Sequence, residues 1–182
     1  LLKKYQLSIE ELYTAFDYCR KIGIEPLCTA WDFKSLERLE KYGLNGYKVA
    51  SADLVNHDLL QKIAGTGKPM ICSTGMSNDT EIKESINLLN KIGAQFALLH
   101  CNSTYPAPFS DINLKFMETL SESGECPVGY SSHDRGVNIV ISAVSLGANI
   151  IEKHFTLDRS LEGNDHRVSL LPDEMKNMVS SI

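Results

Sequence analysis

Apolar and polar positions along this chain follow a pattern that repeats six times. Each repeat begins with a stretch in which apolar residues recur every three or four positions, the spacing of a helix with one buried face. A glycine ends the stretch, as expected for a left-handed helix stop, and a short, continuous apolar run follows and ends in polar residues. Ser8 with Glu11 predicts a capping box for the first helix, and Asp32 predicts an N-cap for the second. The predicted helices span residues 9–22, 33–42, 54–64, 80–92, 112–121 and 137–146, with a seventh at 171–182.

The apolar runs indicate strands of a parallel sheet, because they are continuous rather than alternating and so suit strands covered on both faces. Two architectures fit, an open doubly wound sheet and a (β/α)8 barrel. No G-x-G-x-x-G motif follows a strand, which weakens a dinucleotide-binding sheet, and polar residues end every strand, which favours the barrel. A full barrel has eight units. We therefore expect an α/β chain that forms the last six strands of a TIM barrel, as one partial barrel domain over residues 1–182.

Composition narrows the classes of function. The chain has 182 residues, is 43% hydrophobic and 23% charged, and carries a formal net charge of -5. This acidity argues against a nucleic-acid or anionic membrane partner, and no apolar run reaches the roughly 18 residues of a membrane span. The five cysteines form no C-x-x-C pair and lie mostly in apolar runs, so free thiols are expected. With no signal-peptide layout at the N-terminus, we expect a cytoplasmic protein.

Several predicted strands end in side chains that suit an anionic ligand. Lys48 lies early in an apolar run, where an inward lysine needs an anion or carboxylate partner; a solvent-facing lysine is the alternative. Thr29 and Ser73 end their strands with hydroxyls, which as single residues are explained equally well as turn or capping groups. Asp53 comes just after a strand and is also a candidate N-cap for the next helix.

One strand ends at His100 and leads into a loop with two prolines, which favours a rigid site loop. In that loop Tyr105 either directs its hydroxyl inward or packs on Pro106. His100 beside Cys101 suggests a Cys/His nucleophile pair, although a core histidine is the commoner role for such a residue.

The strongest chemical signal is a pair of histidines on consecutive strands. His133 and His154 each follow a short apolar run. Adjacent parallel strands lie about 4.8 Å apart, so both imidazoles can reach one ion at about 2.1 Å. Imidazoles suit Mn, Fe, Co or Zn, with carboxylates or waters as the other ligands. Glu152 alternates with Lys153 and so shares a face with His154, while Asp165 lies in the loop behind them.

Six motifs occur in a fixed order along the chain: KVASADL, GKPMICSTGM, ALLHCNSTYPAPFSDINL, PVGYSSH, IIEKHFTLDRSLEGNDH and SLLPDE. Together they resemble the sialic acid synthase family, which includes N-acetylneuraminate, N-acylneuraminate-9-phosphate, legionaminic and pseudaminic acid synthases. The resemblance implies a (β/α)8 barrel followed by a small antifreeze-like domain, in a homodimer. It also implies a cytoplasmic C–C bond-forming transferase of carbohydrate biosynthesis. Such an enzyme condenses phosphoenolpyruvate with an N-acetylmannosamine-type aldehyde and releases phosphate.

The resemblance further implies roles for individual positions. His133 and His154 match the metal-binding, catalytic histidines, with Mn²⁺ or Mg²⁺ the usual ion. Asp165 matches a loop carboxylate that binds the amino sugar, and Asp53 stands where some members carry a catalytic glutamate. Tyr105 matches a tyrosine beside the phosphoenolpyruvate. The positions that match phosphoenolpyruvate-binding residues are Thr29, Lys48, Ser51, Ser73, Ser103 and Ser131.

The chain departs from the family pattern in three ways. Many members have S-D-H where this chain has Ser131, Ser132 and His133, so a site carboxylate is missing or is replaced by Asp134. Trp31 stands where a proline is common. The first two barrel strands and the antifreeze-like domain are expected to be absent.

Two alternatives to this function stay open, and within it the sugar is open as well. One is another phosphoenolpyruvate-dependent aldol-type synthase or an aldolase on the same barrel, and another is a non-catalytic fragment. Within the sialic acid synthases, the aldehyde is N-acetylmannosamine, its 6-phosphate or a di-N-acetylated 6-deoxy sugar.

Overall fold

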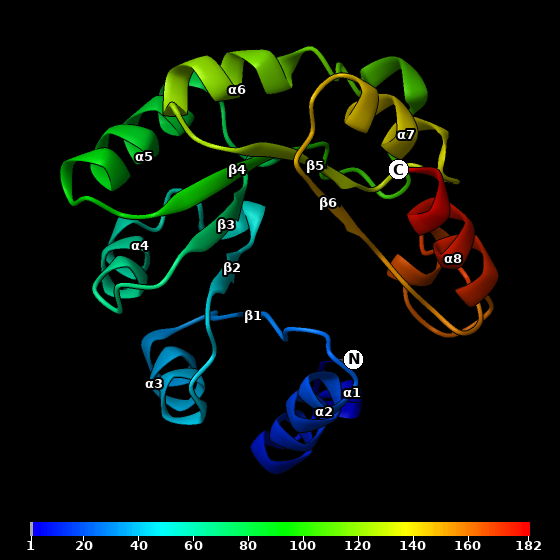
Figure 1. The fold of residues 1–182 in the computed structure, drawn as a ribbon, viewed down its shortest axis with the longest axis horizontal. Helices are drawn as coiled ribbons and strands as arrows, with labels where there is room; N and C mark the ends of the chain where they lie inside the picture. Colours follow the sequence, from blue (N-terminus) through cyan, green and yellow to red (C-terminus); the bar gives the residue numbers. More distant parts are fainter. Residues whose placement is uncertain (1) are drawn as a thin grey trace.

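The computed structural model describes residues 2–182, which form one curved sheet of six parallel strands with helices along its outer side (Figure 1). Neighbouring strands pair in sequence order from β1 to β6, so the chain crosses to the adjacent strand after each helix. Figure 1 shows the sheet as an arc, with α2 near one end and α8 near the other. Six consecutive units in this order confirm the predicted partial TIM barrel.

The elements have the following bounds. The strands are β1 Cys28–Thr29, β2 Tyr47–Val49, β3 Met70–Ser73, β4 Phe96–Cys101, β5 Val128–Ser132 and β6 Ile150–Lys153. The α-helices are α1 Leu2–Tyr5, α2 Ile9–Lys21, α3 Phe33–Tyr42, α4 His57–Ala64, α5 Asp79–Lys91, α6 Phe116–Gly124, α7 Asn138–Ser145 and α8 Pro172–Ser181. Three short 3-10 turns are η1 Ser51–Asp53, η2 Phe109–Asp111 and η3 Asp165–Arg167.

The predicted helix starts follow their capping residues. Ser8 Oγ accepts a hydrogen bond from Glu11 N at 3.2 Å, and the Glu11 carboxylate accepts one from Ser8 N at 2.7 Å. This is the reciprocal capping box, which satisfies two backbone donors that the helix leaves free. Asp32 caps α3 by accepting from Ser35 N. Gly43 ends that helix with a left-handed φ of 86°, a conformation that glycine adopts without strain.

Two predicted helices begin later than their apolar spacing suggests. The helix expected at 54–64 starts at His57, because η1 precedes it and Asn56, not Asp53, accepts the capping bond from Leu59 N. The helix expected at 112–121 is α6, and Asn113, with a left-handed φ of 41°, lies in the turn before it. Glu125, rather than a glycine, then provides the left-handed stop with a φ of 47°.

Side chains on the strands alternate between two environments. Tyr47, Leu98 and Tyr130 point to the outer side and are fully buried, where they form the core with helix residues such as Leu60 and Leu89. The residues between them, at every second position, face the hollow side of the arc. The polar residues at the strand ends therefore meet on the hollow side.

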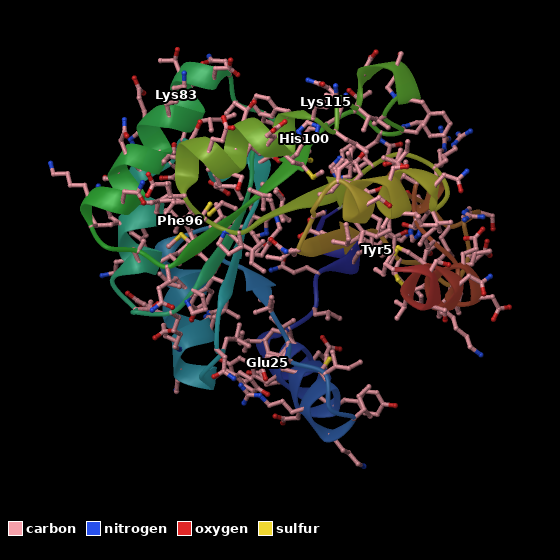
Figure 2. The ribbon with its side chains drawn as sticks, turned by 45° about the horizontal axis from the view of Figure 1, so that its top comes forward. Tyr5, Glu25, Lys83, Phe96, His100 and Lys115 are labelled. Carbon is pink, nitrogen blue, oxygen red and sulfur yellow. The ribbon has the colours of Figure 1, made fainter. Side chains whose placement is uncertain are left out.

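The two ends of the arc also touch. The Lys4 ammonium donates to the Glu162 carboxylate at 2.7 Å, and the Tyr5 hydroxyl donates to the same oxygen at 2.9 Å. Figure 2 shows Tyr5 beside the C-terminal part of the chain. The side chains of Lys4 and Glu162 are 63% and 57% exposed, so this contact lies in solvent.

The expectation of free thiols is confirmed within residues 2–182. All five cysteines are free thiols, with Cys72 and Cys101 buried. None of the helices described has both the length and the apolar character that crossing a membrane requires.

Gly129 marks a point where strand pairing leaves no room for a side chain. A Cβ there would lie 2.1 Å from the Ile150 carbonyl oxygen and 2.8 Å from Leu99 Cδ2. We expect Gly129→Ala to lower the free energy of unfolding by about 3 kcal/mol, because the Ile150 carbonyl and the Leu99 side chain would both have to move to make room for the methyl group. Urea denaturation measures this loss.

Gly65→Ala is the matched control. Its φ is -62°, and a Cβ there meets no atom closer than 3.4 Å. Its free energy of unfolding is expected to change by less than about 1 kcal/mol. Similar losses in the two variants would contradict the tight approach of β5 to β6.

Candidate active site

A cavity of about 480 Å³ lies at the C-terminal ends of the strands, on the hollow side of the sheet. It is lined by Thr29, Trp31, Lys48, Ala50, Ser51, Ala52, Ser73, Met76, Cys101, Ser103, Tyr105, Ser131, His133, Glu152, His154 and Asp165. Every predicted site residue except Asp53 is therefore in one place. A second hollow, of about 620 Å³, lies at the opposite strand ends around residues such as Phe96 (Figure 2) and is mostly apolar.

Lys48 projects from β2 into this cavity. Its ammonium donates to Ser73 Oγ at 2.8 Å and to the Val49 carbonyl at 3.0 Å, and it lies 3.4 Å from a Glu152 oxygen. Its side chain is only 14% exposed, which excludes the alternative of a solvent-facing lysine. A buried ammonium held among hydroxyl and carbonyl oxygens is a ready partner for an incoming anion.

Hydroxyl groups surround this ammonium. Ser51 Oγ accepts a hydrogen bond from Gly75 N at 3.1 Å, and Ser131 Oγ donates to the Glu152 carboxylate at 3.0 Å. Ser103 lies on the β4 side, with its Oγ 3.9 Å from Cys101 Sγ. Hydroxyls can exchange these bonds for bonds to ligand oxygens, because each one both donates and accepts.

His133 is fixed in orientation by two contacts. Its Nδ1 lies 2.7 Å from the Asn102 carbonyl oxygen, which can only accept, so Nδ1 carries a proton. In the neutral ring Nε2 is then the acceptor, and it faces the Tyr105 hydroxyl at 2.8 Å. Tyr105 thus directs its hydroxyl into the cavity, where burial and the nearby Asp165 charge raise its pKa to about 12. An imidazole that donates one N–H to a backbone carbonyl has the usual arrangement of a metal ligand.

His154 stands beside His133 on the neighbouring strand. The two ring centroids are 5.1 Å apart, and His154 Nδ1 lies 4.0 Å from an Asp165 oxygen. Two imidazoles this close fit a divalent ion as a pair of nitrogen ligands. Among residues 2–182, no group of three or more His, Cys, Asp or Glu side chains is arranged to hold an ion.

The pKa values of Cys101, His133 and His154 do not all shift in the same direction. Burial raises the pKa of Cys101, but the hydrogen bond and charge of His133 outweigh burial and lower it. Burial lowers the pKa of His133, yet Cys101 and the Asn102 carbonyl together raise it above its usual value. Burial and the charge of His133 lower the pKa of His154, and Asp165 offsets this only in part. The two histidines therefore favour different protonation states.

The suggested pairing of Cys101 with His100 is wrong. Cys101 faces the cavity, and its Sγ lies 3.6 Å from His133 Nδ1. His100, the preceding residue on β4, faces the outer side (Figure 2), where its Nε2 contacts the Ile112 carbonyl and its ring packs against Phe116. It is the core histidine of the alternative prediction, and burial lowers its pKa.

Two expected carboxylates do not reach the cavity. Asp53 lies outside the lining and accepts a hydrogen bond from the Asn56 amide at 3.2 Å. Asp134 is fully buried on the outer side of the sheet, where it accepts from Tyr130 and Ser132. Ser132 also faces outward, so a carboxylate at that position would not face the cavity.

Besides Asp165, the cavity lining holds a second carboxylate, Glu152, which sequence reasoning had not assigned to the site. Its alternation with Lys153 on β6 was the available signal, because it put Glu152 on the face of His154. Cys101 and Met76 were missed as well. Cys101, the last residue of β4, had been considered only as a partner of His100. Met76 lies three residues past β3 and carries no side-chain signal for ligand binding.

Comparison with known proteins gives consistent matches. The sequence profile of the NeuB family matches residues 1–182. The N,N'-diacetyllegionaminic acid synthase of Campylobacter jejuni is 42% identical over 185 residues, covering 100% of this chain and 55% of the relative. The N-acetylneuraminate-9-phosphate synthase of Homo sapiens is 34% identical over 166 residues, 91% of this chain and 46% of that one.

The fold comparison agrees. The solved structure of the N-acetylneuraminic acid (sialic acid) synthetase of Leptospira borgpetersenii superimposes with a TM-score of 0.95 at 36% identity, covering 100% of this chain and 64% of that one. The chain spans about half the length of the curated relatives it matches.

The opposite pKa shifts can be tested by titration. In the metal-free protein, we expect His133 to take up its proton above its usual pKa of about 6.5 and His154 below it. As the pH falls, His133 is therefore protonated first. Histidine ring NMR signals followed against pH measure both midpoints.

Cys101→Ser tests the cause of the shift, because it removes the thiol that stabilises the His133 cation. The His133 midpoint should fall in this variant. A wild-type protein in which His154 is protonated before His133 would contradict the assigned interactions.

Proposed function

The chain belongs to the NeuB family, and we propose that it forms part of a synthase that condenses phosphoenolpyruvate with an amino-sugar aldehyde. The proposed products are a nonulosonic acid, of the sialic acid type, and inorganic phosphate. The relatives named above are synthases, which supports an enzyme of this general kind. The complete protein, of which the chain is proposed to be the barrel portion, is the species that would turn over.

One observation carries this proposal: a buried ammonium, several hydroxyls and two imidazoles share a single cavity. Lys48 and the serines near it offer donors of the kind that bind carboxylate and phosphate oxygens. The two imidazoles stand on the other side of the same cavity, beside Asp165. A site with groups suited to an anion and groups suited to a divalent ion fits phosphoenolpyruvate together with an oxygen-rich aldehyde.

The bonding changes follow from the two substrates. The enol carbon of phosphoenolpyruvate forms a new C–C bond with the aldehyde carbon, and the aldehyde oxygen becomes a hydroxyl by taking a proton. Water adds to the carbon that carries the phosphate and loses one proton. The C–O bond to phosphate then breaks, and the hydroxyl left on that carbon gives up its proton to become the ketone. Glu152 lies beside Lys48 and Ser131 in the cavity, so it is the carboxylate placed to accept the proton from this water.

The proposed cofactor is Mn²⁺ or Mg²⁺, held by His133 and His154. A bound divalent ion would supply Lewis-acid polarisation of the aldehyde oxygen. Asp165 would orient the amino sugar, since its carboxylate lies at the mouth of the cavity next to His154 and is 67% exposed. Trp31 and Met76 line the same cavity and offer apolar surface for the methyl groups of an acylated sugar.

A phosphate-release assay on the complete protein tests the proposed reaction. The assay combines phosphoenolpyruvate with N-acetylmannosamine, its 6-phosphate or a di-N-acetylated 6-deoxy sugar, in Mn²⁺, Mg²⁺ or EDTA. Release that requires both phosphoenolpyruvate and one of these aldehydes is the expected result. Release of phosphate with simple aldehydes, and with none of the panel, would favour a different aldol-type synthase on the same barrel.

His133→Ala and His154→Ala should each abolish the metal-dependent release, because each removes one of two neighbouring nitrogen ligands. His57→Ala is the matched control, since His57 contacts Ser85 and lies outside the cavity lining. Wild-type activity in either cavity variant would remove the metal assignment.

Lys48→Ala should raise the KM for phosphoenolpyruvate roughly tenfold or more, as expected when a charged hydrogen-bond donor is lost. The KM for the aldehyde should change less. Lys83→Ala is the control, because Lys83 is exposed on α5 and points away from the sheet (Figure 2). An unchanged KM for phosphoenolpyruvate in Lys48→Ala would place this anion elsewhere.

A further inference from the structure

The last paired residues of β5 and β6 stand directly before the two cavity histidines. Ser132 pairs with Lys153 in the strand register, and the next residues are His133 and His154. Because side chains alternate along a strand, Ser132 and Lys153 face the outer side while both imidazoles face the cavity. Whatever fixes Ser132 relative to Lys153 therefore also fixes the backbone from which the imidazoles project.

Lys153 makes these contacts from a closed environment. Its side chain is 1% exposed. Its ammonium donates to Ser132 Oγ at 2.6 Å and also to the Asp134 carbonyl oxygen. Ser132 and Asp134 are the residues on either side of His133. The Lys153 side chain therefore ties both flanks of His133 to the strand that delivers His154.

Asp134 completes this cluster. Its side chain is fully buried, and Oδ1 accepts hydrogen bonds of 2.7 Å from both Tyr130 and Ser132. Its Oδ2 lies 4.0 Å from the Lys153 ammonium and has no hydrogen-bond partner within the described residues. A buried carboxylate and ammonium carry a large desolvation cost, which apolar residues of similar volume would avoid. The Asp134–Lys153 pair is therefore better explained by the position it gives to the neighbouring backbone than by a gain in folding stability.

We propose that Lys153, with Asp134 and Ser132, is a positioning cluster that sets the placement of the His133 and His154 imidazoles and thereby the metal affinity of the site. The inference rests on the proposed metal site. The cluster acts through the backbone, because it lies on the helix-covered side of the sheet and has no contact with the cavity. Two further bonds hold the same backbone: the His133 carbonyl accepts from Ala107 N at 3.0 Å, and the His154 carbonyl from Leu170 N at 2.8 Å.

The test measures Mn²⁺ affinity by calorimetry in the complete protein. Lys153→Met keeps the length of the side chain but removes the ammonium. Its Mn²⁺ affinity should fall by roughly tenfold or more, the usual effect of losing a group that orients a metal ligand. Ser85→Ala is the control for lost stability, since Ser85 is buried and donates to the Leu54 carbonyl, outside the cavity lining. It should weaken folding without changing the Mn²⁺ affinity.

A relocation of the carboxylate provides a rescue experiment. Asp134→Ser alone should weaken Mn²⁺ binding, because it leaves the Lys153 ammonium without its charged partner. Adding Ser132→Asp should recover most of the affinity, since Ser132 Oγ already lies 2.6 Å from that ammonium. Recovery would show that a charged partner for Lys153, rather than Asp134 itself, sets the Mn²⁺ affinity.

The outcomes separate this inference from the proposed function. A wild-type protein that binds no Mn²⁺ overturns the metal site itself. A wild-type protein that binds Mn²⁺, together with a folded Lys153→Met variant of equal affinity, overturns the positioning cluster only. Should Lys153→Met fail to fold, the comparison of Asp134→Ser with the double variant decides, and equal affinity in those two overturns the proposal.

Discussion

The register between β5 and β6 is the constraint on which the site depends. It sets Ser132 opposite Lys153 and so delivers His133 and His154 side by side into the cavity. A slip of one residue would turn every side chain of one strand to the other face and move its histidine into the helix layer. The close approach at Gly129, where a Cβ would strike the Ile150 carbonyl, shows how tightly the two strands are joined.

Much of the fold follows from spacing that is visible in the sequence. Helix and strand types are correct because each helix has one continuous apolar face and each strand is a short apolar run. The start of α6 was misplaced because Ile112 continues the helical spacing, while Asn113 adopts a left-handed conformation that interrupts the backbone. Apolar spacing reports which residues are buried. It does not report where the chain turns between them.

The residues that gather in the cavity could be predicted about as well as the fold, and for a related reason. Parallel strands end at one edge, so residues at strand ends converge even when their individual roles are ambiguous. Beyond the strand ends, the direction in which a side chain points was harder to predict. Asp53 lies four residues past β2 and Asp134 two residues past β5, where turn geometry decides which way a side chain points, and neither reaches the cavity. Alternation would have separated His100 from Cys101, because neighbours on a strand face opposite sides, and the suggested pair overlooked it.

The contact of Lys4 and Tyr5 with Glu162 bears on the mechanics of the arc. Both side chains of this ion pair stand in solvent, where water and salt screen the attraction, so the pair contributes little to stability. Such a contact is too soft to act as a clasp that bends the sheet. The curvature must instead be stored in the sheet itself, as the sum of the twists between successive strands. The shape of the hollow is thus set strand by strand rather than by the contact between the ends of the arc.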